Sequence, residues 1–152
     1  MNFKVISKSP DDTFLVGRSI GAQLKGNEII FMRGELGAGK TLLTKGISQS
    51  LGIDAGEVVS PTFTLMNEFQ YEDGKLYHFD LYRLGPAPVT LPEIDDYMDE
   101  AVIIIEWAQY LHPSYFESAG SIEIDFQLSE QNDDYRTISI KSTLNYLSAE
   151  GL

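Results

Sequence analysis

The sequence predicts an α/β protein whose mixed sheet is parallel at its centre, extended by antiparallel hairpins and covered by helices on both faces. Apolar runs at 28–33 and 101–107 indicate central strands, because strands buried on both faces lack polar alternation. The first run leads directly into a glycine-rich loop and a helical pattern. Alternating segments elsewhere, including 122–128, indicate antiparallel strands with one solvated face.

The first helix is predicted to begin at Pro10. Ser9 is a favourable N-cap, proline suits the first helical position, and Asp12 completes a capping box with the cap residue. Apolar residues then recur at helical spacing, so we expect this helix to continue to about Gly26.

Residues 34–41, with the sequence GELGAGKT, match the pattern G-x-x-x-x-G-K-[ST] at every fixed position. Glycine adopts the positive-φ turns that let a loop present several N–H groups to a phosphate chain. Lys40 is placed to reach the β- and γ-phosphates as an exposed ligand, and the Thr41 hydroxyl is placed to bind Mg²⁺. Helical spacing follows until Gly52. The strand, loop and helix therefore predict a P-loop NTPase-like three-layer sandwich.

The middle of the chain predicts a loop followed by a hairpin. The hydroxyls of Ser60-Pro61-Thr62 could reach a γ-phosphate or a metal-bound water, as in a nucleotide-sensing switch. Ordinary loop chemistry is the alternative explanation of this segment. Strand patterns at 63–71 and 76–83 flank the turn 72–75, and residues 91–100 predict a short acidic helix.

Glu106 and Asp80 are the candidate acids of the site. Glu106 ends the buried strand 101–107, at the edge where ligands bind in open α/β sheets, so we expect it to bind Mg²⁺. A solvent-facing strand end is the alternative for Glu106. Asp80 lies among aromatic residues, where a carboxylate is costly unless it is paired or metal-linked. It is either catalytic, together with Lys40 and Glu106, or paired with Arg83 in a salt bridge.

Two further side chains have open roles. His78 could be catalytic, but a lone histidine among aromatic residues is more often a hydrogen-bonded core residue. Trp107 could stack on a base, contact a partner or fill the core. The chain has neither a guanine-reading Asn-Lys-x-Asp segment nor the motifs of a protein kinase, so ATP is the expected nucleotide.

The C-terminal third predicts another hairpin, with strands at 122–128 and about 138–140 around the turn 131–134. We expect this hairpin to join the main sheet. Residues 142–152 predict either a short helix or a frayed tail.

Composition limits the classes of function. The net charge of −12 disfavours direct binding to tRNA or DNA, whose phosphates repel an acidic surface. The 152 residues fit one domain, and no apolar run or basic N-terminal leader predicts a membrane span or a signal peptide. The chain has no cysteine, which excludes disulfides and thiolate metal sites. We therefore expect a cytoplasmic protein without membrane contact.

Together, four motifs carry a family resemblance. Residues 34–41, 60–65, 77–83 and 105–107 occur in an order and spacing similar to those of the bacterial TsaE (YjeE) family. The sequence thus resembles the small ATPase of the system that makes the threonylcarbamoyladenosine modification of tRNA. One departure is Leu42, where that family usually repeats a threonine.

The resemblance implies a parallel sheet with an antiparallel portion, ATP and Mg²⁺ binding, and slow intrinsic hydrolysis. It also implies assembly with TsaB- and TsaD-type proteins, through which the chain would act on tRNA. In this sequence Thr41 and Glu106 would hold Mg²⁺, Asp80 would be the functionally important aspartate, and Ser60-Pro61-Thr62 would be switch I. The implied nucleotide-binding residues are Thr13, Glu35, Leu36, Gly37, Ala38, Gly39, Lys40, Thr41 and Arg136.

Two other functions use the same loop. A small-molecule or nucleoside kinase would need an acceptor pocket and an arginine-rich lid, and the chain has only 11 basic residues. An ATP-dependent binding module would not hydrolyse ATP, and its Asp80 and Glu106 would be purely structural. We favour an ATPase whose hydrolysis drives a partner's cycle.

Overall fold

The computed structural model of the protein describes residues 1–86, 88–150 and 152. Its helices and 3₁₀ turns are α1 (Pro10–Gly21), α2 (Lys40–Leu51), η1 (Ala55–Glu57), α3 (Pro92–Tyr97), η2 (Ala108–Tyr110) and η3 (Pro113–Glu117). Its strands are β1 (Asn2–Ser7), β2 (Ile29–Arg33), β3 (Met66–Tyr71), β4 (Gly74–Asp80), β5 (Val102–Glu106), β6 (Ser121–Leu128) and β7 (Arg136–Ser142). No helix of the described residues is long and apolar enough to cross a membrane.

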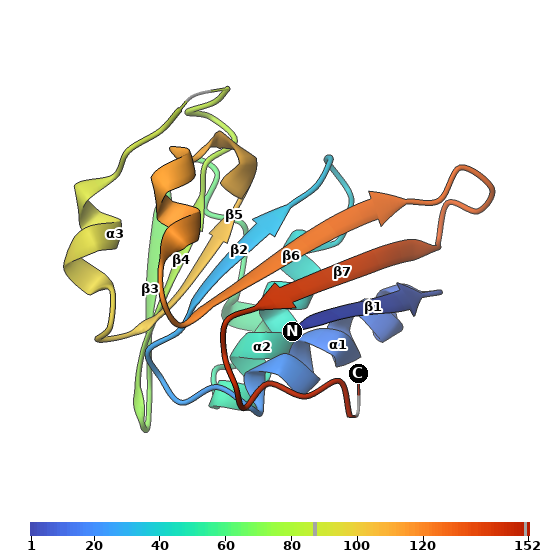
Figure 1. The fold of residues 1–152 in the computed structure, drawn as a ribbon, viewed down its shortest axis with the longest axis horizontal. Helices are drawn as coiled ribbons and strands as arrows, with labels where there is room; N and C mark the ends of the chain where they lie inside the picture. Colours follow the sequence, from blue (N-terminus) through green and yellow to red (C-terminus); the bar gives the residue numbers. More distant parts are fainter. Residues whose placement is uncertain (87, 151) are drawn as a thin grey trace.

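The seven strands of the described residues form one mixed sheet, in the order β1-β7-β6-β2-β5-β4-β3 (Figure 1). The central strands β6, β2, β5 and β4 run parallel to one another. Antiparallel pairs extend the sheet at both edges, with β7 and β1 beside β6 and β3 beside β4. The predicted α/β class, with a parallel core and antiparallel hairpins, is confirmed.

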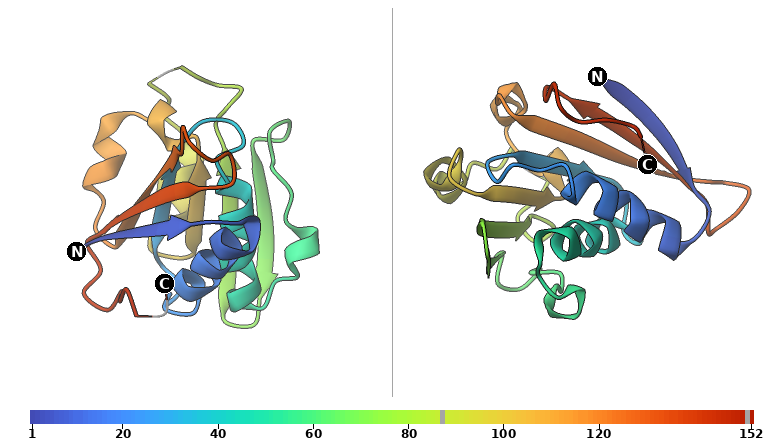
Figure 2. Two further views of the ribbon diagram at one scale, coloured as in Figure 1. Left: turned by 90° about the vertical axis from the view of Figure 1, so that its right-hand side faces the viewer. Right: turned by 90° about the horizontal axis from the view of Figure 1, so that it is seen from below.

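The central strands are buried on both faces, which explains their continuous apolar sequence. In β2, Ile30 and Met32 pack into the core beneath α1 and α2, whereas Ile29 and Phe31 pack into a second core on the opposite face. Figure 2 shows α1 and α2 side by side against one face, and α3 contributes Ile94 to the second core. Helix layers therefore cover both faces of the sheet's centre.

Helices α1 and α2 touch through their backbones because glycines lie at the crossing point. A Cβ atom on Gly46 would lie 2.1 Å from the carbonyl oxygen of Phe14, and one on Gly17 would lie 2.2 Å from that of Leu43. No side chain fits at such distances. This contact fixes the position of α2, and with it the loop that precedes the helix.

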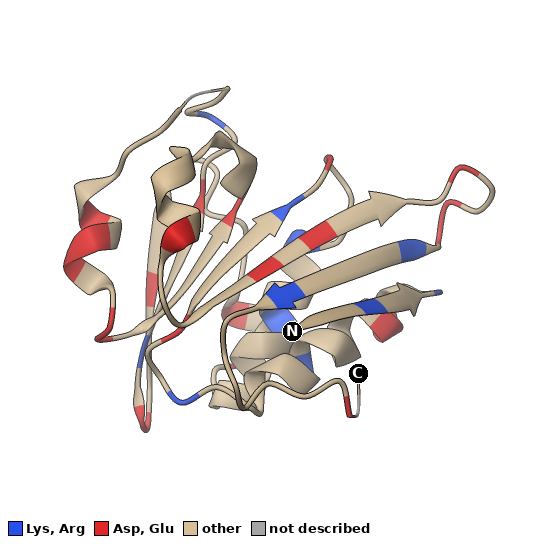
Figure 3. Cartoon of the chain, in the orientation of Figure 1, with Lys and Arg blue, Asp and Glu red and all other residues tan. Residues whose placement is uncertain are grey.

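Acidic side chains are distributed over much of the molecule (Figure 3). They include Glu93, Asp95 and Asp96 on α3, whereas β7 and β1 carry several of the basic residues. The chain has 23 acidic and 11 basic residues, which give its net charge of −12, a balance that disfavours direct contact with nucleic acid.

Several predicted boundaries were wrong. Helix α1 ends at Gly21 rather than near Gly26, and α3 spans Pro92–Tyr97 rather than 91–100. Strand β3 begins at Met66 rather than at residue 63, and β4 ends at Asp80 rather than at residue 83. Turns or irregular backbone follow or precede the regular elements at these ends.

Two terminal segments also differ from expectation. The N-terminal strand β1 was not predicted, yet it pairs with β7 from Asn2 to Ser7. The described residues after β7 form neither a helix nor a frayed tail, because Leu144 and Leu147 are buried in the core and the Tyr146 hydroxyl donates to Glu28.

Candidate nucleotide-binding site

The glycine-rich loop joins β2 to α2 and leaves backbone N–H groups available to a ligand. Gly37 and Gly39 have φ angles of 74° and 109°, which side chains rarely tolerate. No atom lies within 4 Å of a Cβ built on Gly37, so open space lies beside this residue. Gly39 is the N-cap of α2 and gives it no side-chain hydrogen bond. The helix N-terminus thus retains donors that suit an anion.

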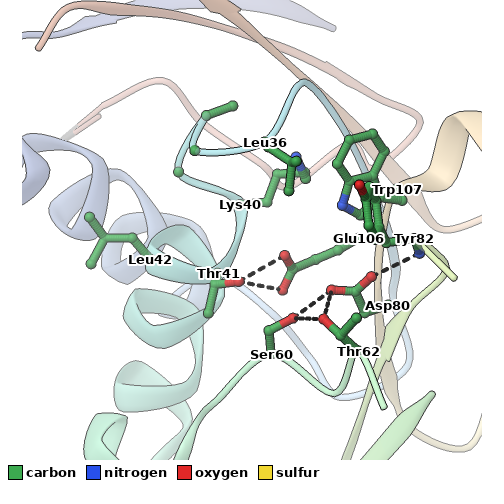
Figure 4. A pocket seen from close by; sticks show the side chains of 13 residues that line it. Leu36, Lys40, Thr41, Leu42, Ser60, Thr62, Asp80, Tyr82, Glu106 and Trp107 are labelled. Atoms are coloured by element: carbon green, nitrogen blue, oxygen red, sulfur yellow. Dashed lines mark hydrogen bonds between the residues drawn. The ribbon is translucent and has the colours of Figure 1, made fainter. Parts of the chain in front are cut away.

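This loop borders a cavity of about 440 Å³ at the carboxyl ends of β4 and β5 (Figure 4). Residues from four separate segments meet there, and Leu42 and Tyr82 are the two among them that the sequence did not predict as site residues. The lining residues are Leu36, Gly37, Ala38, Gly39, Lys40, Thr41, Leu42, Ser60, Thr62, Asp80, Tyr82, Glu106 and Trp107.

Lys40 is buried, contrary to the expected exposed ligand, with 5% of its surface accessible. Its Nζ donates to the carbonyl oxygens of Gly34 at 2.7 Å and Glu35 at 2.8 Å, and lies 4.3 Å from the centre of the Trp107 ring. Burial lowers the pKa of Lys40, and the nearby carboxylates of Glu106, Asp80 and Glu35 oppose that effect. The ammonium group is therefore held in place by the loop itself.

Glu106 does not face solvent, because it is 2% exposed. It is the last residue of β5, and its carboxylate accepts hydrogen bonds from the Thr41 hydroxyl at 2.9 and 3.2 Å. The predicted pairing of Thr41 with Glu106 is thus present in space, although 65 residues separate them in the chain. Both side chains belong to adjacent elements at the carboxyl edge of the sheet.

Asp80 lies beside Glu106 across the β4–β5 ladder. Its Oδ2 accepts hydrogen bonds from Ser60 at 2.5 Å and from Thr62 at 3.4 Å, and its Oδ1 accepts one from the backbone N–H of Tyr82 at 2.9 Å. The loop of Ser60 therefore docks on this carboxylate.

The alternative salt bridge between Asp80 and Arg83 was wrong. Arg83 instead donates to the carbonyl oxygen of Phe63 at 3.0 Å and lies 5.5 Å from the centre of that ring. Phe63 is 86% exposed, so this pair lies outside the cavity. Between the two hydroxyls that face Asp80, Pro61 is buried and does not line the cavity.

His78 and Trp107 occupy different positions relative to the cavity. His78 is fully buried, does not line the cavity and contacts Glu106 through Nε2. Trp107 lines the cavity and is 7% exposed, with its ring centre 4.9 Å from that of Tyr82 and 5.4 Å from that of Tyr110. Its φ of 60° turns the chain away directly after β5.

Thr13 and Arg136 lie on the other side of the loop, in a second cavity of about 120 Å³. Thr13 shares a hydrogen bond of 2.7 Å with Ser7, and Nη2 of Arg136 donates to the carbonyl oxygen of Gly37 at 3.2 Å. Asp134 also lines this cavity, and nothing in its turn sequence distinguishes it beforehand. The loop thus separates two adjacent spaces.

Among the described residues, no cluster of three or more His, Cys, Asp or Glu side chains could hold a metal ion. Thr41 and Glu106 offer one hydroxyl and one carboxylate as oxygen ligands. Mg²⁺ usually binds through one or two protein oxygens, waters and substrate phosphates, so this sparse donor set fits Mg²⁺ that arrives with a nucleotide.

Comparison with known proteins decides the family. The family profile described as "Threonylcarbamoyl adenosine biosynthesis protein TsaE" matches residues 7–138, which include both cavities. The chain belongs to the TsaE family. The expected resemblance is thereby confirmed, and TsaE membership covers most of the chain rather than the glycine-rich loop alone.

Curated relatives carry the same name. A protein of Aquifex aeolicus (strain VF5), named tRNA threonylcarbamoyladenosine biosynthesis protein TsaE, is 39% identical over 109 residues, which cover 70% of this chain and 77% of that protein. A Bacillus subtilis (strain 168) protein of the same name is 32% identical over 139 residues, covering 90% of this chain and 84% of its own.

A solved structure has the same fold. The crystal structure of YdiB from Bacillus subtilis superposes with a TM-score of 0.73 at 26% sequence identity. The match covers 97% of this chain and 89% of that one. This protein therefore shares its mixed sheet and helix layers with a protein whose structure was determined by crystallography.

Proposed function

We propose that this TsaE chain, residues 1–152, is a single-domain, Mg²⁺-dependent ATPase that acts in the cytoplasm in tRNA threonylcarbamoyladenosine biosynthesis. The observation that carries the proposal is one cavity that combines a buried lysine, a hydroxyl–carboxylate pair and a second carboxylate with docked hydroxyls. These are the groups that phosphoryl transfer to water needs. The pathway is supported by the printed names of the relatives.

The loop binds the triphosphate. The N–H groups around Gly37 and Gly39, with the uncapped N-terminus of α2, provide donors to the phosphate oxygens. Lys40 exchanges its two carbonyl acceptors for phosphate oxygens and keeps a full charge beside them. The second cavity, next to Thr13 and Arg136, takes the ribose or base.

Two carboxylates divide the remaining work. Thr41 and Glu106 would hold Mg²⁺, which neutralises the charge that develops on the phosphates. Asp80 accepts a hydrogen bond from the attacking water and so orients it toward the γ-phosphate. Ser60 and Thr62 keep that carboxylate within the cavity and move with the loop when the γ-phosphate is lost.

Hydrolysis serves partner proteins rather than a substrate of this chain. The net charge of −12 opposes direct contact with tRNA, so the chain acts on tRNA through TsaB- and TsaD-type proteins. The cavity of about 440 Å³ leaves little room for a second substrate beside a triphosphate. Intrinsic hydrolysis is slow, and partner contact stimulates it.

Phosphate release from Mg²⁺-ATP tests this function. Glu106→Gln and Asp80→Asn should each lower the rate by about 10²-fold or more, because each removes one charged group from the transition-state environment. Glu57→Gln and Asp73→Asn are matched controls on exposed side chains and should leave the rate unchanged. Unchanged release in both cavity variants would refute the catalytic assignments.

The same assay separates the alternatives. ATP consumption that depends on an added small acceptor and yields its phosphorylated form would favour a small-molecule or nucleoside kinase. ATP binding without phosphate release, with or without the partner proteins, would favour a non-hydrolysing binding module.

A further inference from the structure

His78 is a buried polar residue with a single polar contact. The ring lies on β4, none of its surface is exposed, and Nε2 contacts Oε2 of Glu106. Its other nitrogen, Nδ1, has no hydrogen-bond partner among the described residues. A buried imidazole with one hydrogen-bonded nitrogen and one nitrogen that lacks a partner requires a physical explanation.

The contact determines which nitrogen carries the proton. A carboxylate only accepts hydrogen bonds, so the N–H of the ring lies on Nε2 and donates to Glu106. The tautomer with its N–H on Nδ1 would bury an unpaired donor and set two acceptors against each other. The N–H that donates to Glu106 is therefore on Nε2, and Nδ1 is the nitrogen without a partner among the described residues.

His78 has no route to the nucleotide. It does not line the cavity, and Glu106 stands between the ring and Thr41. A role as general acid or base needs a proton within hydrogen-bond reach of the reacting atoms. The catalytic alternative for His78 therefore does not fit its position.

The carboxylate of Glu106 is gripped from two sides. His78 holds Oε2 from within the sheet, and the Thr41 hydroxyl approaches Oε1 at 2.9 Å from the cavity side. A side-chain carboxylate rotates easily about its last bond unless such partners fix it. The Thr41 hydroxyl lies 2.9 Å from Oε1 and 3.2 Å from Oε2, so it faces the carboxylate whose orientation His78 limits (Figure 4).

We propose that His78 is a positioning residue, whose Nε2–H fixes the carboxylate of Glu106 in the orientation in which it would hold Mg²⁺ beside Thr41. The inference rests on the proposed function, because it assigns His78 a task in the same Mg²⁺-ATP site. Residues that hold metal ligands in this way typically change metal affinity by about 10–100-fold when they are replaced.

A pair of substitutions separates hydrogen bonding from packing. In His78→Gln the side-chain amide reaches the place of Nε2 and can donate to Glu106. In His78→Asn the shorter amide reaches only the place of Nδ1. His112→Asn is the matched control, because His112 is exposed and bonds to Ser114 instead.

The first readout is ATP affinity by calorimetry at increasing Mg²⁺, and in EDTA. His78→Asn should require about 10–100-fold more Mg²⁺ while binding ATP in EDTA as the wild type does. His78→Gln should restore most of the Mg²⁺ dependence, and His112→Asn should not change it. In a Glu106→Gln background, His78→Asn should have no further effect.

The second readout needs no ligand. The chain contains two histidines, so ¹⁵N spectra of the imidazoles contain two rings, which His112→Asn assigns. The proton of His78 should lie on Nε2, exchange slowly with water and shift in Glu106→Gln. This measurement remains informative even if His78→Asn does not fold.

Each outcome bears on the inference. A proton on Nδ1, equal behaviour of the Gln and Asn variants, or a wild-type Mg²⁺ requirement in folded His78→Asn would overturn the role of His78 and leave the proposed ATPase intact. A wild type that binds no Mg²⁺-ATP would overturn the proposed function, and the assigned task of His78 with it.

Discussion

Replacement of Lys40 by alanine should weaken ATP binding far more than it weakens the fold. Removing one member of a buried charge pair costs about 3–5 kcal/mol. In the protein without nucleotide, the ammonium group of Lys40 already donates to two carbonyl oxygens, at 2.7 and 2.8 Å, and it gives up these hydrogen bonds when it binds phosphate. We therefore expect the lower end of this range, and a loss of about 3 kcal/mol corresponds to an ATP affinity about 150-fold weaker.

The fold should tolerate the same change. The carbonyl groups of Gly34 and Glu35 belong to the loop at the edge of the cavity, so water can replace the ammonium group. We expect the free energy of unfolding to fall by less than about 1.5 kcal/mol, with one cooperative transition in urea.

Isothermal titration of ATP in Mg²⁺ measures the loss of affinity. Lys45→Ala is the matched control, because Lys45 lies on the same helix and does not line the cavity. An affinity of Lys40→Ala within a few-fold of the wild type, with the Lys45→Ala control unchanged, would refute the assignment of the loop as a triphosphate site.

Three further predictions concern the base side, the helix crossing and acid stability. Arg136→Ala should lower the affinity for ATP about 10-fold yet leave the affinity for tripolyphosphate unchanged, because Arg136 lines the smaller cavity. Equal losses of affinity for ATP and tripolyphosphate in titration calorimetry would contradict this. Gly46→Ala should destabilise the protein by about 1–3 kcal/mol in urea unfolding, whereas exposed Gln49→Ala should change stability by less than about 0.5 kcal/mol; a neutral Gly46→Ala would argue against the close crossing. Burial raises the pKa of Glu28, but hydrogen bonds from Tyr146 and from the N–H groups of Lys25 and Gly26 outweigh it and hold the pKa below its usual 4.5. Ionised Glu28 therefore contributes its full stabilisation above pH 4.5, and this contribution is lost as the pH falls through the lower pKa of the folded state. In urea unfolding at pH 3–6, Glu28→Gln should lose less stability on acidification than the wild type does. An equal loss of stability in the two proteins would contradict this role of Glu28.

Local patterns sufficed for the centre of the fold. The apolar runs of β2 and β5 and the loop between β2 and α2 each reflect requirements of a short segment, so they are visible in sequence. The pairing of Thr41 with Glu106 was also predictable, because Glu106 ends β5, Thr41 follows the loop after β2, and the carboxyl ends of these two strands meet at one edge of the sheet.

Features that depend on distant contacts were not predictable. Lys40 is buried because the ring of Trp107, on another element, covers it. His78 bonds to Glu106 only because β4 and β5 are neighbours in the sheet. Strand β1 alternates weakly over six residues, and its pairing with β7 joins the two ends of the chain. Such long-range pairings leave little signal in any single segment.

Reconstituted modification of tRNA tests the central claim most directly. The chain, TsaB- and TsaD-type proteins of the same organism, ATP, Mg²⁺ and the substrates of threonylcarbamoylation would be combined, and modified adenosine and released phosphate measured together. We predict that Glu106→Gln lowers both quantities in parallel, while Glu57→Gln supports wild-type levels of both. Full modification with Glu106→Gln, at a phosphate release reduced to background, would contradict a role of ATP hydrolysis at this site.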